Sequence, residues 1–168
     1  MESFAIPGAG AIIEKKINSK DYILVQDRWK DNAPMEKGLI EIPAGKIRAF
    51  ENIFDCLRRE VKEETGLDVI EIEGEAESQV CEINGYKVLN YNPFSSSQNI
   101  NDHYPIMVQI FICKVSGKII KMTNETRNIR WISLEELGIA LKKCVNSFYP
   151  MHVDTLKKYL SYKIGKVV

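Results

Sequence analysis

The chain has 168 residues, the length of one ordinary domain with one hydrophobic core. Hydrophobic residues make up 45% and charged residues 27%, and 23 basic side chains are matched by 23 acidic ones. This balance gives no support for binding to nucleic acid or to an anionic membrane, and no apolar run approaches the roughly 20 residues that span a bilayer. Because there is no internal repeat or linker either, we expect one soluble domain over residues 1–168.

The cysteines and histidines limit the metal chemistry. The four cysteines are Cys56, Cys81, Cys113 and Cys144. None forms a C-x-x-C pair, so we interpret them as buried small hydrophobic residues in a reducing compartment. Neither His103 nor His152 has a neighbouring Cys or His, so no zinc site is expected. The N-terminus also lacks a secretory pattern, and we therefore expect a cytoplasmic protein whose metal, if any, is held by carboxylates.

The first predicted elements are strands. Residues 9–15 and 21–28 are rich in apolar side chains and predict the two β-strands of a hairpin. Residues 29–38 contain proline and glycine and predict a loop. Residues 39–42 form a short predicted strand, which Pro43 ends because proline cannot donate to a strand ladder.

A helix is predicted over residues 50–65, which contain neither glycine nor proline. Its apolar side chains recur at helical spacing. They are Phe50, Ile53, Phe54, Leu57 and Val61. Gly66 follows at the position where a glycine commonly ends a helix.

The second half of the chain is mainly extended. Residues 68–91 are rich in β-forming side chains, and residues 106–114 predict a strong strand. Between them, residues 92–104 are polar and predict a long loop, and residues 129–132 predict a last short strand.

Two helices are expected at the C-terminal end. Ser133 and Glu136 form the pattern of a capping box, in which each side chain satisfies the other residue's backbone N–H. A final helix is predicted after Pro150. These elements together predict one mixed α/β domain.

Three acids of the predicted 50–65 helix lie on one side of it, because Glu60, Glu63 and Glu64 are three and four positions apart. Glu60 and Glu64 fall beside Ile53 and Leu57, at the border of the apolar face. Carboxylates crowded at such a border repel one another and lose hydration, and a divalent cation compensates for both effects. A solvated acidic face paired with neighbouring basic side chains is the alternative for an arbitrary helix.

The wider pattern favours the metal. Residues 45–67 match the Nudix box, G-x5-E-x7-R-E-U-x-E-E-x-G-U with U apolar, at every defined position. Those positions are Gly45, Glu51, Arg59, Glu60, Val61, Glu63, Glu64, Gly66 and Leu67. Nine residues at fixed spacing are far more specific than a lone glycine-rich loop. The chain therefore resembles the Nudix hydrolase family, strongly over residues 39–67 and in general element order elsewhere.

The resemblance implies a fold, a cofactor and a set of site residues. The fold is an α/β/α sandwich of the Nudix type, with a mixed β-sheet between helices, and the cofactor is Mg²⁺ or Mn²⁺. The implied metal ligands are acidic side chains and a backbone carbonyl near the start of the box. They are Glu60, Glu63, Glu64 and the carbonyl of Ala44 or Gly45. Glu51 and Arg59 are expected to support the site by pairing.

Diphosphate hydrolysis needs a water aimed at phosphorus and stabilised phosphate oxygens, which metal ions and acids provide without a nucleophilic side chain. Glu63, Glu64 and Glu125 are the candidate catalytic residues. Glu125 precedes the last predicted strand and is the first candidate for the general base, with Glu63 as the alternative. A loop carboxylate in water is an equally good interpretation of Glu125.

Residues 39–46 resemble the E-(L/I)-P-A-G-K segment typical of ADP-ribose and other nucleotide-sugar pyrophosphatases, whereas triphosphate-cleansing members more often carry two glycines at Ala44-Gly45. We therefore predict hydrolysis of a nucleoside diphosphate linked to another moiety, with Arg28 and Glu41 as candidate substrate-binding residues.

One departure weakens the ADP-ribose interpretation, since Glu82-Ile83-Asn84-Gly85 stands where that subgroup generally has a proline. A nucleoside triphosphate pyrophosphohydrolase and a nucleotide-sensing binding module remain the alternatives. A homodimer is common in the resembled family.

Overall fold

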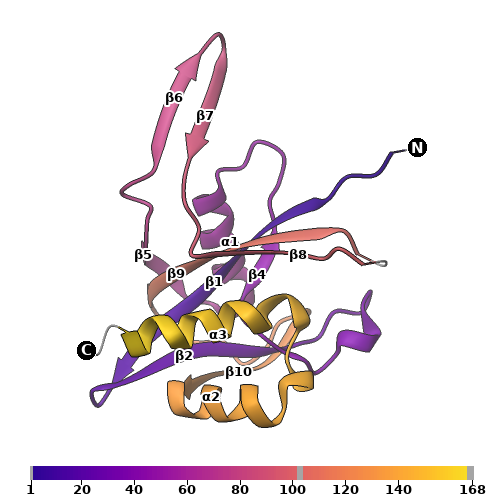
Figure 1. Cartoon of the computed structure of the whole chain (residues 1–168), viewed down its shortest axis with the longest axis vertical. Helices are drawn as coiled ribbons and strands as arrows, with labels where there is room; N and C mark the ends of the chain where they lie inside the picture. Colours follow the sequence, from indigo (N-terminus) through magenta and orange to yellow (C-terminus); the bar gives the residue numbers. More distant parts are fainter. Residues whose placement is uncertain (1, 102–103, 166–168) are drawn as a thin grey trace.

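An eight-stranded mixed sheet forms the centre of the protein in the computed structural model, which describes residues 2–101 and 104–165 (Figure 1). His103 and part of the 92–104 segment therefore lie outside the described residues. The strands of this sheet are β1 (Ile6–Ile17), β2 (Lys20–Arg28), β3 (Ile40–Glu41), β4 (Ala44–Lys46), β5 (Asp68–Ile72), β8 (Ser95–Gln98), β9 (Ile106–Ser116) and β10 (Thr126–Ser133). The main path runs β10-β2-β1-β9-β5; β1 and β9 are parallel, and the other paired strands of this sheet are antiparallel.

In the described residues, three α-helices cover the two faces of the sheet. They are α1 (Ile53–Thr65), α2 (Leu134–Lys143) and α3 (Pro150–Gly165). Two 3-10 turns, η1 (Pro34–Glu36) and η2 (Val145–Ser147), lie in the connections. A separate hairpin of β6 (Gln79–Ile83) and β7 (Tyr86–Asn90) projects from the body of the protein (Figure 1).

Alternating side chains of the central strands fill two separate hydrophobic cores. Ala11, Ile13 and Leu24 pack on one face with residues of α1. Ile12 and Ile23, one position away along the same strands, pack on the other face with residues of α2 and α3. This alternation follows from the two-residue period of a strand. The predicted α/β/α sandwich with a mixed sheet is therefore confirmed.

The signals at the helix ends are also confirmed. Gly66 ends α1 in the left-handed conformation, with φ of 79°. Ser133 and Glu136 make both hydrogen bonds of the capping box at the start of α2. The predicted start of α1 was wrong, because the helix begins at Ile53 after the cap residue Asn52, and Phe50 is fully exposed with φ of 62°. Helical spacing cannot detect that an apolar side chain lies outside the helix.

Two other predictions require correction. The predicted loop at 92–104 contains β8, which pairs with β9 through the backbone although its Ser-Ser-Ser-Gln sequence has no apolar alternation. All four cysteines are free, and Cys56 and Cys113 are buried as predicted, but Cys81 and Cys144 are exposed. Across the described part of the chain, no helix is both long and apolar enough to cross a bilayer.

Candidate active site

A cleft of about 1030 Å³ collects the box acids and most of the other predicted site residues. Its walls come from segments that are far apart in the sequence. They lie within residues 28–36, 41–48, 59–64, 104–108, 123–125 and 149–152. Every predicted catalytic, metal-binding and substrate-binding residue lines this cleft. Of the two predicted supporting residues, Arg59 lines the cleft and Glu51 does not.

The carboxylate of Glu60 lies directly against the backbone of Gly45. A Cβ atom added to Gly45 would be 1.9 Å from Cδ of Glu60, far inside van der Waals contact. The glycine thus leaves room for the Glu60 carboxylate, and any larger side chain here would displace that carboxylate. The same approach brings the Ala44 N–H within 3.2 Å of Glu64 Oε2, to which it donates.

Arg59, on α1, binds Glu51 in the segment just before that helix. Its Nε and Nη2 donate to the two carboxylate oxygens of Glu51 at 2.7 and 2.8 Å, which is the two-pronged geometry of a strong arginine–carboxylate pair. These hydrogen bonds lower the pKa of Glu51 to about 2. Nη1 of the same arginine contacts Glu60 and lies 3.3 Å from Glu63. The predicted Glu51–Arg59 pair therefore exists.

Glu64 is the buried acid of the site, with only 4% of its surface exposed. Its Oε2 accepts from Gln26 Nε2 at 2.8 Å and from the Ala44 N–H, whereas its Oε1 is buried and has no hydrogen-bond partner among the residues that the structure describes. Burial first, and the nearby charge of Glu41 second, raise the pKa of Glu64. A perturbed carboxyl group in a cleft is a common mark of a functional site.

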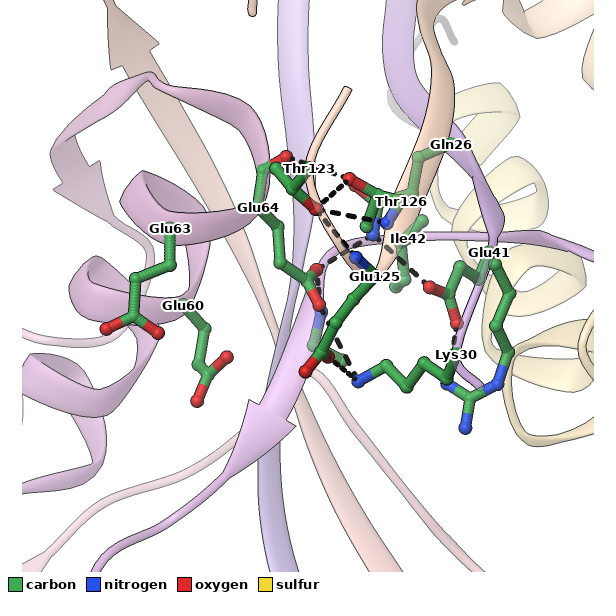
Figure 2. A network of polar contacts seen from close by, with 12 residues as sticks. Gln26, Lys30, Glu41, Ile42, Glu60, Glu63, Glu64, Thr123, Glu125 and Thr126 are labelled. Carbon is green, nitrogen blue, oxygen red and sulfur yellow. Dashed lines mark hydrogen bonds and ion pairs between the residues drawn. The ribbon is translucent and has the colours of Figure 1, made fainter. Parts of the chain in front are cut away.

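Lys30 connects Glu64 to the loop before β10. Its Nζ lies 2.7 Å from Glu125 Oε2 and 3.9 Å from Glu64 Oε1. Glu125 is about half exposed, and its backbone N–H donates to Thr123 Oγ1. Figure 2 shows Glu60 and Glu63 side by side on α1, and Glu64 pointing away from them toward Lys30 and Glu125.

Arg28 and Glu41 lie together at another part of the cleft. Glu41 is buried and accepts from Arg28 Nη1 at 3.0 Å, while Arg28 Nε donates to Glu36 at 2.6 Å. The guanidinium also lies 4.4 Å from the ring centre of Tyr149. Arg28 thus reaches the cleft as a cation already held by two acids and an aromatic ring.

Several residues of the site had no role in the sequence-based prediction. Gln26 bridges Glu41 and Glu64, and Thr126 donates to the Glu64 backbone carbonyl at 3.2 Å. His152, fully buried on α3, accepts from the Ile42 N–H, and burial lowers its pKa to about 3. Gln26 carried the only available signal, since it is a polar residue after the apolar run Ile-Leu-Val.

The donors in the cleft suit a hard cation. They are carboxylate and carbonyl oxygens, which Mg²⁺ and Mn²⁺ prefer, and Glu64 Oε1 is a buried oxygen that accepts no hydrogen bond from the described part of the chain. As the side chains lie, no three acidic, histidine or cysteine side chains within residues 2–101 and 104–165 converge enough to hold an ion. Arg59 and Lys30 instead provide the positive charge next to the acids.

Comparison with known proteins identifies the family. Residues 6–152 match the family model described as NUDIX domain, so the chain belongs to the Nudix family, whose members are hydrolases of phosphoric anhydrides. No curated protein matches the sequence.

Solved structures with the same fold come from several organisms. A C. elegans Ap4A hydrolase is 17% identical, with 96% of this chain and 99% of that chain covered and a TM-score of 0.57. A MutT protein from Methanosarcina mazei Go1 is 20% identical, with 97% of each chain covered and a TM-score of 0.59. The NUDIX domain of Shewanella oneidensis NrtR, complexed with ADP ribose, is 12% identical, with 96% and 90% covered and a TM-score of 0.66. At these identities the likeness shows the fold.

Proposed function

We propose that this Nudix hydrolase is metal-dependent and cleaves the diphosphate bond of a nucleoside diphosphate linked to another moiety, with ADP-ribose or a related nucleotide sugar as substrate. The observation that carries the proposal is the cleft itself. At about 1030 Å³ it is at the upper end of small-molecule sites, and it places box acids in one part and the Arg28–Tyr149 pair in another. A substrate with groups on both sides of a diphosphate matches that division.

The acids are the proposed metal ligands. Glu60, Glu63 and Glu64, with the carbonyl of Ala44 or Gly45, would hold Mg²⁺ or Mn²⁺, which supplies charge neutralisation for phosphate oxygens and a more acidic water. Oε1 of the buried Glu64 accepts no hydrogen bond from the described residues and has only Lys30 Nζ, 3.9 Å away, as a nearby cation, and this supports Oε1 as a metal ligand.

Glu125 is the proposed general base. The oxygen of a water molecule bonds to phosphorus, the bridging P–O bond breaks, and the proton of the water passes to the Glu125 carboxylate. Two products that each end in a phosphate leave the cleft. The backbone contacts of Glu125 with Thr123 and Trp29 support this role, because they hold the loop at the cleft. Glu63 is about equally exposed and is the alternative base.

Arg28 and Glu41 are the proposed substrate-binding residues beyond the diphosphate. Arg28 offers a cation and Tyr149 an aromatic ring within the same cleft, and such a pair suits a phosphate, ribose or base. The fold likeness to a NUDIX domain solved with ADP ribose is consistent with this substrate class.

Product analysis tests the proposal. The wild-type enzyme is incubated with ADP-ribose, nucleotide sugars and dNTPs, with Mg²⁺ or Mn²⁺ and then with excess EDTA. We expect AMP and ribose phosphate from ADP-ribose, no turnover in EDTA, and a loss on the order of 10²-fold or more in kcat for both Glu64→Gln and Glu125→Gln.

Other outcomes would replace parts of the proposal. Pyrophosphate released from a triphosphate would assign the enzyme to nucleoside triphosphates. Full turnover by Glu125→Gln would transfer the general-base role to Glu63. Nucleotide binding without turnover of any substrate would indicate a sensing module.

A further inference from the structure

Gln26 is a polar side chain in the interior of the protein. It lies on β2 directly after the buried run Ile23-Leu24-Val25 and is itself completely buried. Burying an amide is costly unless its donors find partners. Its Nε2 donates to Glu64 Oε2 at 2.8 Å and to Glu41 Oε1 at 3.3 Å, while its Oε1 has no hydrogen-bond partner among the described residues. The contacts of this amide are thus with the two acids.

The two acids that share this amide come from different elements. Glu41 is on β3 and Glu64 is on α1, so the amide on β2 joins three elements at one point (Figure 2). Two buried carboxylates close together repel each other, and a donor placed between them offsets part of that repulsion. Because the amide is neutral, it does so without cancelling the negative charge that attracts a cation.

The contacts of Glu64 divide its two oxygens into different roles. Oε2 accepts from Gln26 and from the Ala44 N–H at 3.2 Å, so two donors from two strands fix this oxygen. Within residues 2–101 and 104–165, Oε1 has no hydrogen bond, and Lys30 Nζ lies 3.9 Å from it. The side chain is therefore held with one oxygen anchored and the other left available.

We propose that Gln26 is a positioning residue: by anchoring Glu64 Oε2, its amide orients Glu64 Oε1 to ligate the catalytic metal ion. This inference rests on the metal-dependent function proposed above. A glutamate has three rotatable side-chain bonds, and a ligand that must first be ordered binds its metal more weakly. Residues that hydrogen-bond to a metal ligand and orient it typically contribute 10- to 100-fold to metal affinity or activity.

The test is a titration of wild type and Gln26→Met with Mn²⁺ alone, in which electron paramagnetic resonance measures the free ion. Methionine keeps the length of the side chain and removes the amide. We expect the Kd for Mn²⁺ to rise about 10- to 100-fold in the variant. In turnover assays we expect kcat to fall at limiting Mn²⁺ and to recover as Mn²⁺ is raised, with the KM for substrate unchanged.

Two further variants make the result specific. Thr155→Val removes a hydrogen bond made by another buried polar side chain, from Thr155 Oγ1 to Ser95 Oγ at 2.9 Å, and Thr155 does not line the cleft. It is expected to keep the wild-type Mn²⁺ Kd. Gln26→Asn keeps a polar amide on a side chain one methylene shorter, which moves the amide away from Glu64 Oε2. It therefore tests the loss of the same hydrogen bond if the methionine variant does not fold.

The outcomes separate the two proposals. Wild type that binds no Mn²⁺ would refute the metal-dependent function itself. Wild type that binds Mn²⁺ while a folded Gln26 variant binds it equally well would refute the positioning role alone. Equal weakening in Thr155→Val would also refute that role, because it would show a general effect of core damage.

Discussion

The close contact between Gly45 and Glu60 allows the position of one carboxylate to be changed without altering any charge. In Gly45→Ala, the new Cβ would lie 1.9 Å from Cδ of Glu60 and 2.0 Å from its Oε2, whereas ordinary contact begins near 3.4 Å. The carboxylate must therefore retreat by the difference, about 1.5 Å. The atoms that must move are the far end of a flexible side chain, so the backbone of β4 and α1 can stay in place.

We expect a large effect on activity and a small effect on stability. Displacement of a reacting or ligating group by about 1 Å can cost on the order of 10²-fold in rate. We therefore expect kcat/KM at a fixed, limiting Mg²⁺ concentration to fall by about 10²-fold in Gly45→Ala. Thermal unfolding should change little, since alanine also lowers the entropy of the unfolded chain.

Gly138→Ala is the matched control. Gly138 lies within α2, and a Cβ there would find its nearest neighbour, Leu160 Cδ1, at 3.8 Å, which is ordinary contact. This variant is expected to keep full activity and to gain up to about 1 kcal/mol of stability from its higher helix propensity. A Gly45→Ala enzyme with wild-type kcat/KM at limiting Mg²⁺ would refute the idea that the Glu60 carboxylate must lie against Gly45.

Two further predictions concern stability and pH. Hydrogen bonds from Arg59 lower the pKa of Glu51 to about 2, below its unfolded value near 4.3. The ionised Glu51 therefore stabilises the folded protein above about pH 4.3, and this contribution is lost as the pH falls toward 2. Glu51→Gln should cost about 2 kcal/mol in urea unfolding at pH 7, with the gap closing near pH 2; an equal gap at both pH values would contradict this. Burial lowers the pKa of His152 to about 3, so between about pH 6.5 and 3 the unfolded chain binds a proton that the folded protein does not. From pH 7 to pH 5 wild type should lose about 2 kcal/mol more stability than His152→Gln, and parallel pH profiles would show that His152 is not held neutral.

Features that depend on neighbours along the chain could be predicted from the sequence. The capping box of Ser133 and Glu136 spans three residues, and Gly66 ends α1 where the helical pattern stops. The spacing of Glu60, Glu63 and Glu64 was enough to predict a shared acidic side of one helix, because the helix repeat relates residues three and four apart. The box pattern led from there to the family, which the match over residues 6–152 confirmed.

Local pattern was insufficient where hydrogen bonds or packing come from distant residues. Strand β8 is polar and forms because β9 offers its edge. Phe50 has the apolar character of a helix residue, yet it lies before the cap at Asn52. For β8 the deciding partner is a distant backbone edge, which carries no sequence signal of its own. For α1 it is the Asn52 side chain, which accepts from the Phe54 N–H and marks the start of the helix more strongly than apolar spacing does.

The sequence by itself determined the mixed α/β elements and the helix that carries the box acids, because side-chain periodicity and end signals act within a few residues, and the resemblance to the Nudix family implied the sandwich. Only the tertiary structure decided how those acids are held. Gln26 contacts Glu64 across 38 positions, and His152 contacts Ile42 across 110. Such contacts depend on how strands and helices pack, and burial then changes the charge that each group prefers. The sequence therefore identified the acids, and the fold determined their partners, exposure and pKa.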